Sequence, residues 1–365
     1  MKKHFSILPT LILLCLAIGL DIGFKYDLKH SGTGFTEEIQ DGESLGQDII
    51  SFIFVQVRVV ITLLIWYMTY EISPALGMEI IIVWIMSRIF TDIAKLLYAD
   101  PRPYWYDDDI EAKECNFDWG NPSGHTLGIC TVLIYAAYKL KNLGIWKYPV
   151  VGVYILYVGY IRVYFGEHFY SQVVLALFFA VFIINVVIVY EKELGDYVSS
   201  LNTSKPVIIL HLACTGIYTL GAFILLVRFP GWGEDWTDNI DDECDQDIDE
   251  WDAALETLAG LGAIFYACGA SLGYYCLNQY HLDLWYNVRS SKKSLGRLGL
   301  LILGILITHF FFFIFIYGTY QVLALFIIIY FEYVNGFLFM FIIPYISEKL
   351  KLNKEPEERP ILNQN

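Results

Sequence analysis

Long apolar runs recur along the whole chain and constrain its fold more than any other feature. A bilayer core about 30 Å thick needs roughly 20 apolar residues per spanning helix, and about ten such runs are present. They lie near residues 6–23, 49–69, 75–97, 124–140, 148–165, 171–190, 206–228, 253–278, 298–316 and 320–345. The 365 residues are 56% hydrophobic and only 17% charged, which excludes an ordinary soluble domain. The sequence predicts an all-α, polytopic integral membrane protein of about ten transmembrane helices.

The basic residues are unevenly distributed over the connections between these runs. One side of the membrane receives fifteen of the 24 lysines and arginines, including those near both ends of the chain. Because lysine and arginine are retained on the cytoplasmic side of short loops, we expect both termini in the cytosol. The first run also fits a secretory signal peptide, whose cleavage would leave about nine helices without moving any later loop to the other face.

The acidic residues gather on the opposite, luminal or extracellular face, in segments 21–48 and 234–252. The second segment has eleven carboxylates and no basic residue, so the net charge of −15 is local rather than general. We interpret this segment as solvated or as facing a protein partner, and its Cys244 can pair with Cys115 on the same face. Nucleic-acid binding has no support in this distribution.

Three cations lie at helix ends on the same luminal or extracellular face. Lys95 ends one apolar run, and Arg102 follows seven residues later between Pro101 and Pro103, which limit local backbone freedom. Arg162 ends another run. Arginine presents a planar fork of donors to phosphate oxygens, whereas lysine acts as a mobile point charge. The pattern therefore predicts a site for a phosphate dianion.

Two histidines accompany these cations. Ser123, Gly124 and His125 precede an apolar helix, whose free N–H groups and positive dipole end favour an anion. Ser123 suits a helix N-cap or a phosphate donor, and Gly124 lets backbone N–H groups approach an anion. His125, with a pKa near neutrality, is the predicted general acid. His168 is the predicted nucleophile, because imidazole can form a covalent phosphoryl intermediate.

These segments together resemble the phosphatidic acid phosphatase type 2 superfamily of membrane histidine phosphatases, whose pattern is K-x6-RP, then PSGH, then SR-x5-H-x3-D. Residue by residue, the resemblance assigns these positions to phosphate binding and catalysis: Lys95, Arg102, Ser123, Gly124, His125, Arg162 and His168. It implies hydrolysis of a phosphate monoester through a phosphohistidine, with no cofactor and no metal. The cysteines show no CxxC or Cys/His metal spacing.

The sequence departs from this pattern at two positions. Ile161 precedes the arginine where the family has serine, and Gln172 stands where the family has the aspartate that orients the nucleophilic histidine. Gln172 can accept a hydrogen bond but contributes no charge. The glucose-6-phosphatase branch is similar here, since it carries His-Phe-x-x-Gln, and it has nine spans with a long luminal loop. Gln172 is therefore the predicted nucleophile-orienting residue.

The resulting organisation has four consecutive parts. Residues 1–48 hold a transmembrane helix or signal anchor and an acidic luminal loop, and 49–190 form the catalytic helical core. Residues 191–347 hold the C-terminal transmembrane helices with the acidic luminal loop 229–252, and 348–365 form a cytoplasmic tail. Resemblance favours the endoplasmic reticulum or another endomembrane as the location.

Several alternatives stay open at this stage. The substrate is a lipid phosphate or glucose 6-phosphate, with neither favoured. The missing aspartate also fits a non-catalytic membrane subunit or transporter that keeps the phosphatase fold. Tyr104, Trp105 and Tyr106, with the aspartates at 107–109, fit either a substrate rim or an anchor at the membrane interface. Arg88 and Asp92, one helical turn apart, are expected to pair.

Overall fold

The computed structural model describes residues 2–41, 57–227, 233, 235–280, 291–316, 321–350 and 352. These residues form helices and no strand, which confirms the predicted all-α class. Residues 42–48, 229–232, 234, 351 and 353–365, which belong to the predicted loops and tail, lie outside the described residues. Each of the ten predicted apolar runs is helical over most of its described part.

Contacts between Cα atoms divide the chain into two compact units. Unit 1 consists of Met1–Ile61, Met86–Glu191 and Tyr218–Leu261, and unit 2 of Thr62–Ile85, Lys192–Ile217 and Gly262–Asn365. All the residues of the three motifs lie in unit 1. The four consecutive parts expected from the sequence concern topology in a membrane and stay a prediction.

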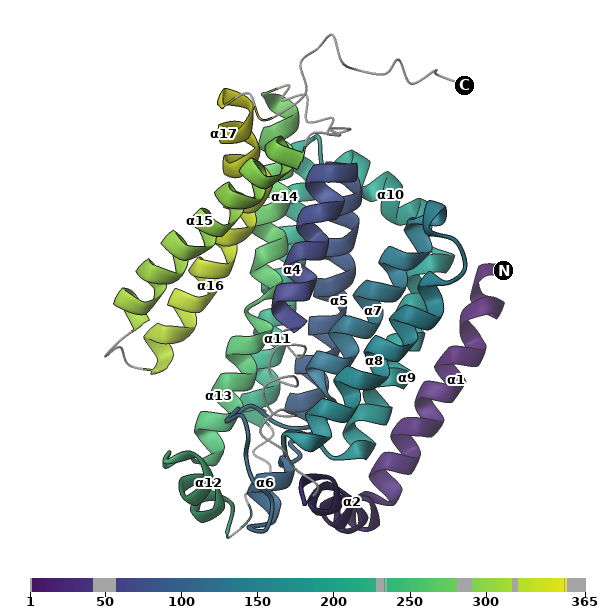
Figure 1. The fold of residues 1–365 in the computed structure, drawn as a ribbon, viewed down its shortest axis with the longest axis vertical. Coiled ribbons are helices and arrows are strands. Elements are labelled where there is room, and N and C mark those ends of the chain that lie inside the picture. Colours follow the sequence, from purple (N-terminus) through teal and green to yellow (C-terminus); the bar gives the residue numbers. More distant parts are fainter. Residues whose placement is uncertain are drawn as a thin grey trace. The chain divides into compact units, whose positions relative to one another are not determined.

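Unit 1 is built around a group of antiparallel helices. Its helices are α1 (Lys2–Gly23), α2 (Lys25–Gln40), the end of α5 (Pro74–Tyr98), α6 (Pro103–Tyr106), α7 (Gly124–Lys139), the short η2 (Lys141–Leu143), α8 (Lys147–Tyr164), α9 (Tyr170–Val189), the end of α11 (Ser204–Val227), α12 (Trp236–Cys244) and α13 (Glu250–Leu261). Helices α7, α8 and α9 pack against one another, and α1 lies along α9. Figure 1 shows α2, α6 and α12 gathered at one end of this group.

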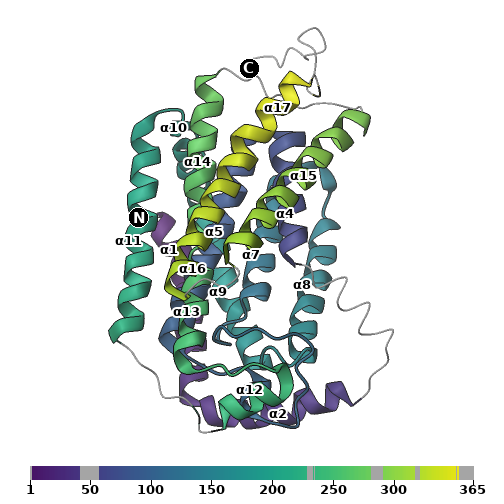
Figure 2. The ribbon, with the colours of Figure 1, turned by 90° about the vertical axis from the view of Figure 1, so that its left-hand side faces the viewer.

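Two helices of unit 1 occupy segments that were expected to be connecting loops. Helix α2 lies at 81° to α1 and contacts α6, α8 and α9. Helix α12 contacts α6, and both helices lie at the same end of the unit in Figure 2. Hydropathy missed them because both are rich in charged residues. A connection outside the membrane can be helical, so the expected luminal loops at these two segments stay a prediction.

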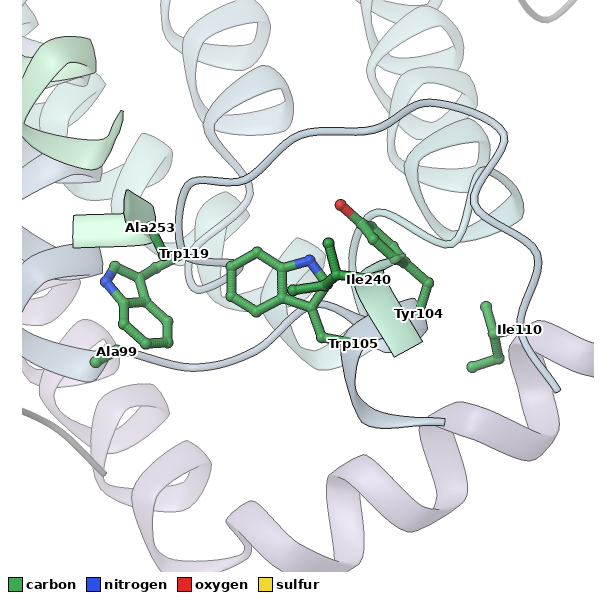
Figure 3. Packing of buried hydrophobic residues seen from close by; sticks show 7 residues of the cluster. All are labelled: Ala99, Tyr104, Trp105, Ile110, Trp119, Ile240 and Ala253. Atoms are coloured by element: carbon green, nitrogen blue, oxygen red, sulfur yellow. The ribbon is translucent and has the colours of Figure 1, made fainter. Parts of the chain in front are cut away.

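An apolar cluster fastens the segment between α6 and α7 to α12 and α13. Tyr104, Trp105 and Trp119 are fully buried there, and Figure 3 shows the two indole rings close to Ile240 and Ala253. The centroids of the two tryptophan rings lie 5.7 Å apart. The prediction that Tyr104 and Trp105 line a substrate rim or anchor at the interface is therefore wrong, because burial of these large rings stabilises the fold instead.

The disulfide between Cys115 and Cys244 ties the same segment to α12 and closes a separation of 129 residues. This confirms the pairing that the sequence suggested. The segment 107–123 between α6 and α7, called the site loop below, is thus held by a covalent bond as well as by its aromatic residues. It connects the first and second motifs of the sequence.

Unit 2 consists of the remaining helices. They are the end of α4 (Val57–Tyr67), whose residues 57–61 belong to unit 1, the π-helical turn η1 (Met68–Ile72), the start of α5, α10 (Glu191–Ser200), the start of α11, α14 (Ile264–Gln279), α15 (Ser291–Ile316), α16 (Gln321–Phe337), the π-helical turn η3 (Leu338–Ile342) and α17 (Ile343–Lys349). A Cβ atom at Gly269 of α14 would lie 1.8 Å from the carbonyl oxygen of Tyr333. Glycine thus lets α14 and α16 approach closely, as small residues do between membrane helices.

The lengths and hydropathies of the helices are those of an integral membrane protein. Among the described residues, four helices are long and apolar enough to cross a bilayer: Tyr170–Val189, Ser204–Leu225, Glu250–Gln279 and Leu323–Lys349. The bent pair of α1 and α2 would make a fifth. Other helices fall short for visible reasons, since α7 has only 16 residues and α5 carries Glu79, Arg88, Asp92 and Lys95. The expected total of about ten spans is therefore not confirmed.

Candidate active site

The two cations of the first motif share one carboxylate. Lys95, in the last turn of α5, and Arg102, just before α6, each form an ion pair with Asp118 of the site loop. One carboxylate oxygen faces each cation, and the Arg102 Nε also donates to the Asp118 carbonyl at 2.8 Å. Burial alone would raise the pKa of the Asp118 carboxyl, but the two cations hold it well below its usual range. Asp118 is therefore ionised and bridges Lys95 to Arg102.

A second carboxylate joins the first motif to the third. Glu167 forms ion pairs with Arg102 and with Arg162, the latter at 3.1 Å. Its other oxygen accepts from Asn116 at 2.9 Å, and its side chain is fully buried. Arg162 also pairs with Glu114 at 2.7 Å. The three predicted cations thus lie together, as the sequence predicted, but each already faces a carboxylate.

His168 lies in a sharp turn between α8 and α9. Gly166 adopts a positive φ of 69°, and a Cβ there would lie 2.6 Å from the Glu111 carbonyl oxygen, so this turn requires glycine. The N–H groups of both Glu167 and His168 donate to the Arg162 carbonyl at 3.1 Å. The turn therefore places His168 directly beside the end of the helix that carries Arg162.

One ring nitrogen of His168 has two oxygen atoms within hydrogen-bond distance. Nδ1 lies 2.8 Å from the Gly120 carbonyl oxygen and 3.2 Å from Gln172 Oε1. A carbonyl oxygen only accepts, so Nδ1 carries the proton and the lone pair of a neutral ring lies on Nε2. Burial lowers the pKa of His168 well below its usual value, and Arg102, Arg162 and Lys95 lower it further. The ring is therefore neutral near pH 7.

Gln172 connects all three motifs through its amide and its backbone. Its Nε2 donates to the Pro101 carbonyl at 3.0 Å, which turns Oε1 toward His168. Oε1 also accepts the N–H of Phe169, the N-cap residue of α9, at 3.3 Å. The carbonyl of Gln172 accepts from the Ser123 N–H at 3.2 Å. The structure thus places Gln172 where the sequence expected it, with Gly120 as the closer partner of the ring.

The second motif begins α7, as expected, but the Ser123 side chain does not cap the helix. Ser123 occupies the N-cap position without a side-chain capping bond, and its hydroxyl lies 3.0 Å from that of Thr126. A Cβ at Gly124 would lie 3.1 Å from the Thr91 methyl group, so this glycine also permits close approach of α5 and α7. His125 is half-buried in the first turn of α7. The predicted pair of Arg88 and Asp92 is present at 3.1 Å.

A second polar network connects residues of the first and second motifs to α1 and α2. The Asn121 amide donates to Asp100 at 2.9 Å and to Asp21 of α1 at 2.8 Å. Asp100 also forms ion pairs with Lys25 and Lys29 of α2, and its carbonyl accepts the N–H of Gly120 at 2.8 Å. The Asn121–Pro122 peptide is cis. Residues before the first motif thus support the backbone that holds His168.

The residues that pair with the predicted cations and histidine carry no motif signal in the sequence. Asp118, Glu114 and Glu167 are ordinary acidic residues within or beside the motifs, and the Gly120 carbonyl has no side chain to reveal it. One signal was available: three buried cations require carboxylate partners, although the sequence does not show which acidic residues supply them. One group of three acidic side chains in the described residues, Glu37, Asp107 and Asp109, is close enough to share a cation. None of these three belongs to a motif.

Comparisons with known proteins add a family for part of the chain. Residues 76–196 match the model of the PAP2 superfamily. One solved structure, the crystal structure of the first transmembrane PAP2 type phosphatidylglycerolphosphate phosphatase from Bacillus subtilis, is similar with a TM-score of 0.43 and 18% sequence identity. The match covers 53% of this chain and 98% of that one. A search of curated proteins finds no significant match.

Proposed function

We propose that this chain, whose residues 76–196 match the model of the PAP2 superfamily, is a membrane phosphatase that hydrolyses a phosphate monoester through a phosphohistidine at His168. The observation that carries the proposal is the hydrogen bond of His168. Its Nδ1 lies 2.8 Å from the Gly120 carbonyl oxygen and carries the proton, so the lone pair of Nε2 is available beside three cations. A neutral, oriented imidazole next to an anion site is suited to attack on phosphorus.

The reaction proceeds in two displacements. Nε2 of His168 attacks phosphorus, the bond from phosphorus to the ester oxygen breaks, and His125 donates a proton to the departing alcohol. Water then attacks the phosphohistidine, the phosphorus–nitrogen bond breaks, and inorganic phosphate leaves while His125 takes the proton back. Lys95, Arg102 and Arg162, with Ser123 and Gly124 at the start of α7, bind the phosphoryl oxygens as charge develops. Protein groups carry every step, so no metal or cofactor is invoked.

Trapping of the intermediate tests this proposal. Purified protein in detergent, quenched after mixing with a 32P-labelled ester, should retain acid-labile label on a histidine, with or without EDTA. His168→Ala should lose both the label and turnover, by at least about a thousandfold. His125→Ala should still acquire the label, and its turnover should fall most for esters with poor leaving groups. Normal turnover in His168→Ala would exclude the mechanism. No hydrolysis of any ester by the wild type would favour the non-catalytic subunit or transporter.

The substrate is proposed to be a lipid phosphate or glucose 6-phosphate. The match to the PAP2 superfamily model is compatible with a lipid phosphate, whereas Gln172 is the residue that the glucose-6-phosphatase branch carries. Release of phosphate should therefore be compared for phosphatidate, a long-chain-base phosphate, an isoprenoid phosphate and glucose 6-phosphate in the same detergent. Activity confined to one class identifies the substrate.

The proposed topology has about ten spans, both termini in the cytosol and the active site facing the lumen or the exterior of an endomembrane. The disulfide between Cys115 and Cys244 supports this placement, because disulfides persist in oxidising compartments. Asn202 belongs to a glycosylation sequon on the opposite, cytoplasmic side. An engineered sequon at Asp108 should be glycosylated in microsomes and Asn202 should not; the reverse pattern would invert the topology.

A further inference from the structure

Each cation of the proposed phosphate site is already neutralised by a carboxylate of this chain. Asp118 faces Lys95 and Arg102, Glu114 faces Arg162, and Glu167 lies between the two arginines. Three positive charges thus meet three negative ones. A substrate phosphate must therefore compete with these carboxylates for the cations.

The three carboxylates differ in how accessible they are. The Glu167 side chain is fully buried and also bonded to Asn116, so it belongs to the framework. Asp118 is 21% exposed and Glu114 is 43% exposed, whereas the cations they face are 4% exposed or less. Asp118 and Glu114 therefore lie on the solvent side of the cations, across the path that a phosphate would take.

The contacts of Asp118 are those that a phosphate would make. Its two oxygens reach two different cations, one from each end of the first motif. The backbone of the site loop is held separately, by the disulfide at Cys115 and by the bond from Arg102 Nε to the Asp118 carbonyl. A rotation of the Asp118 side chain can thus free both cations without unfolding the loop.

We propose that Asp118, assisted by Glu114, is a specificity-determining residue that occupies the phosphate site as an internal anion and yields only to a phosphate monoester dianion. The proposal rests on the proposed function for the identity of the ligand. A phosphodiester or a carboxylate carries one negative charge, like Asp118 itself, and gains little by replacing it. A monoester dianion brings a second charge and further oxygens for Arg162, so it can displace the internal carboxylates.

The internal anion has a measurable effect on affinity. A ligand that binds only the fraction of molecules with a free site shows an affinity reduced by that fraction. Replacement of Asp118 by the isosteric, neutral asparagine should remove the competitor. We expect orthophosphate and orthovanadate to bind Asp118→Asn at least about tenfold more tightly than the wild type, and dimethyl phosphate, a monoanionic diester, to gain measurable binding.

The test uses isothermal titration of the full-length protein in detergent, so it does not depend on turnover. Asp108→Asn is the matched control, because Asp108 is an exposed aspartate of the same site loop, and it should bind phosphate as the wild type does. Glu114→Gln should tighten binding less than Asp118→Asn, since it frees only one cation. Unchanged or weaker phosphate binding by folded Asp118→Asn would overturn the proposal.

A second measurement on the wild type covers the case in which the variant does not fold. Carbodiimide coupling of an amine to Asp118, followed by peptide mass spectrometry, should increase at least about threefold when vanadate saturates the site, because the displaced carboxylate becomes accessible. Labelling of Asp108 should not change. If vanadate binds and leaves the labelling of Asp118 unchanged or reduced, the internal-anion role is excluded, whether or not any ester is hydrolysed.

Discussion

His168 is held more closely by the backbone of Gly120 than by the side chain of Gln172. Its Nδ1 lies 2.8 Å from the Gly120 carbonyl oxygen and 3.2 Å from Gln172 Oε1. The ring thus has two neutral acceptors in place of one carboxylate. A neutral acceptor fixes the tautomer and orientation of the ring as a carboxylate does, but it stabilises the cationic phosphohistidine less.

Gly120 should not tolerate any side chain. A Cβ there would lie 2.7 Å from the Pro101 carbonyl oxygen and 2.9 Å from both terminal atoms of Gln172. Gly120→Ala should therefore displace the carbonyl that holds His168 and lower kcat at least about a hundredfold. Gly152→Ala is the control, because a Cβ at Gly152 of α8 meets nothing within 4 Å. Phosphate release by the two variants gives the comparison; equal activities would show that the Gly120 carbonyl does not position the ring.

Loss of the Gln172 side chain should lower kcat less than loss of an orienting aspartate usually does. Gln172→Leu removes the weaker acceptor of His168 and the bond to the Pro101 carbonyl, but the Gly120 carbonyl remains. Loss of a neutral hydrogen bond costs about 1 to 1.5 kcal/mol, so kcat should fall about tenfold with little change in KM. Gln279→Leu in α14 is the control for the substitution. A loss of a thousandfold or more would mean that Gln172, not Gly120, is the main partner.

The cation cluster could be predicted from the sequence because the motif residues are recognisable by residue type and spacing. Lys95, Arg102 and Arg162 do lie together, and His168 is near them, since each is delivered by a helix end. The Gly120 carbonyl could not be predicted, because backbone atoms carry no residue signal. Asp118 could not be singled out among many acidic residues. Its position beside the cations depends on the disulfide and on Trp119, which hold the site loop.

The fold, like the site, was predictable only where a local sequence pattern determines the structure. Apolar runs predict membrane helices because the bilayer imposes their length and composition. Helices α2 and α12 lack such a run, and they form because they pack on unit 1 through residues such as Ile240 and Gly32, which contacts Phe169. Tertiary contacts of this kind are not visible in a local window of sequence, so the two helices and the burial of Trp105 were missed.

Asp21 should support the site from outside the segment that matches the family. Its carboxylate accepts from the buried Asn121 amide at 2.8 Å, next to Gly120. Asp21→Ala leaves a buried donor with one partner fewer and should lower the free energy of unfolding by about 1 to 3 kcal/mol, with a fall in kcat. Asp27→Ala, at an exposed position of α2, is the control. Melting temperatures and kcat equal to those of the control would show that α1 does not support the site.

The buried, neutral state of His168 should make the stability of the protein depend on pH. Burial and the neighbouring cations depress its pKa in the folded state, whereas in the unfolded chain the pKa is about 6.5. As the pH falls from about 7.5 to 5.5, the unfolded chain binds a proton that the folded protein does not bind, so folding stability decreases. For one proton this loss is about 1 kcal/mol over that range.

His168→Gln removes this proton without changing any other titrating group. Its free energy of unfolding in mixed micelles should therefore fall by about 1 kcal/mol less than that of the wild type between pH 7.5 and 5.5. His30→Gln, at an exposed position of α2, should keep the wild-type dependence. The same pH dependence in wild type and His168→Gln would mean that His168 accepts a proton as readily in the folded protein as in the unfolded chain. The ring would then be largely protonated at acidic pH, and Nε2 would lose the lone pair that attack on phosphorus requires.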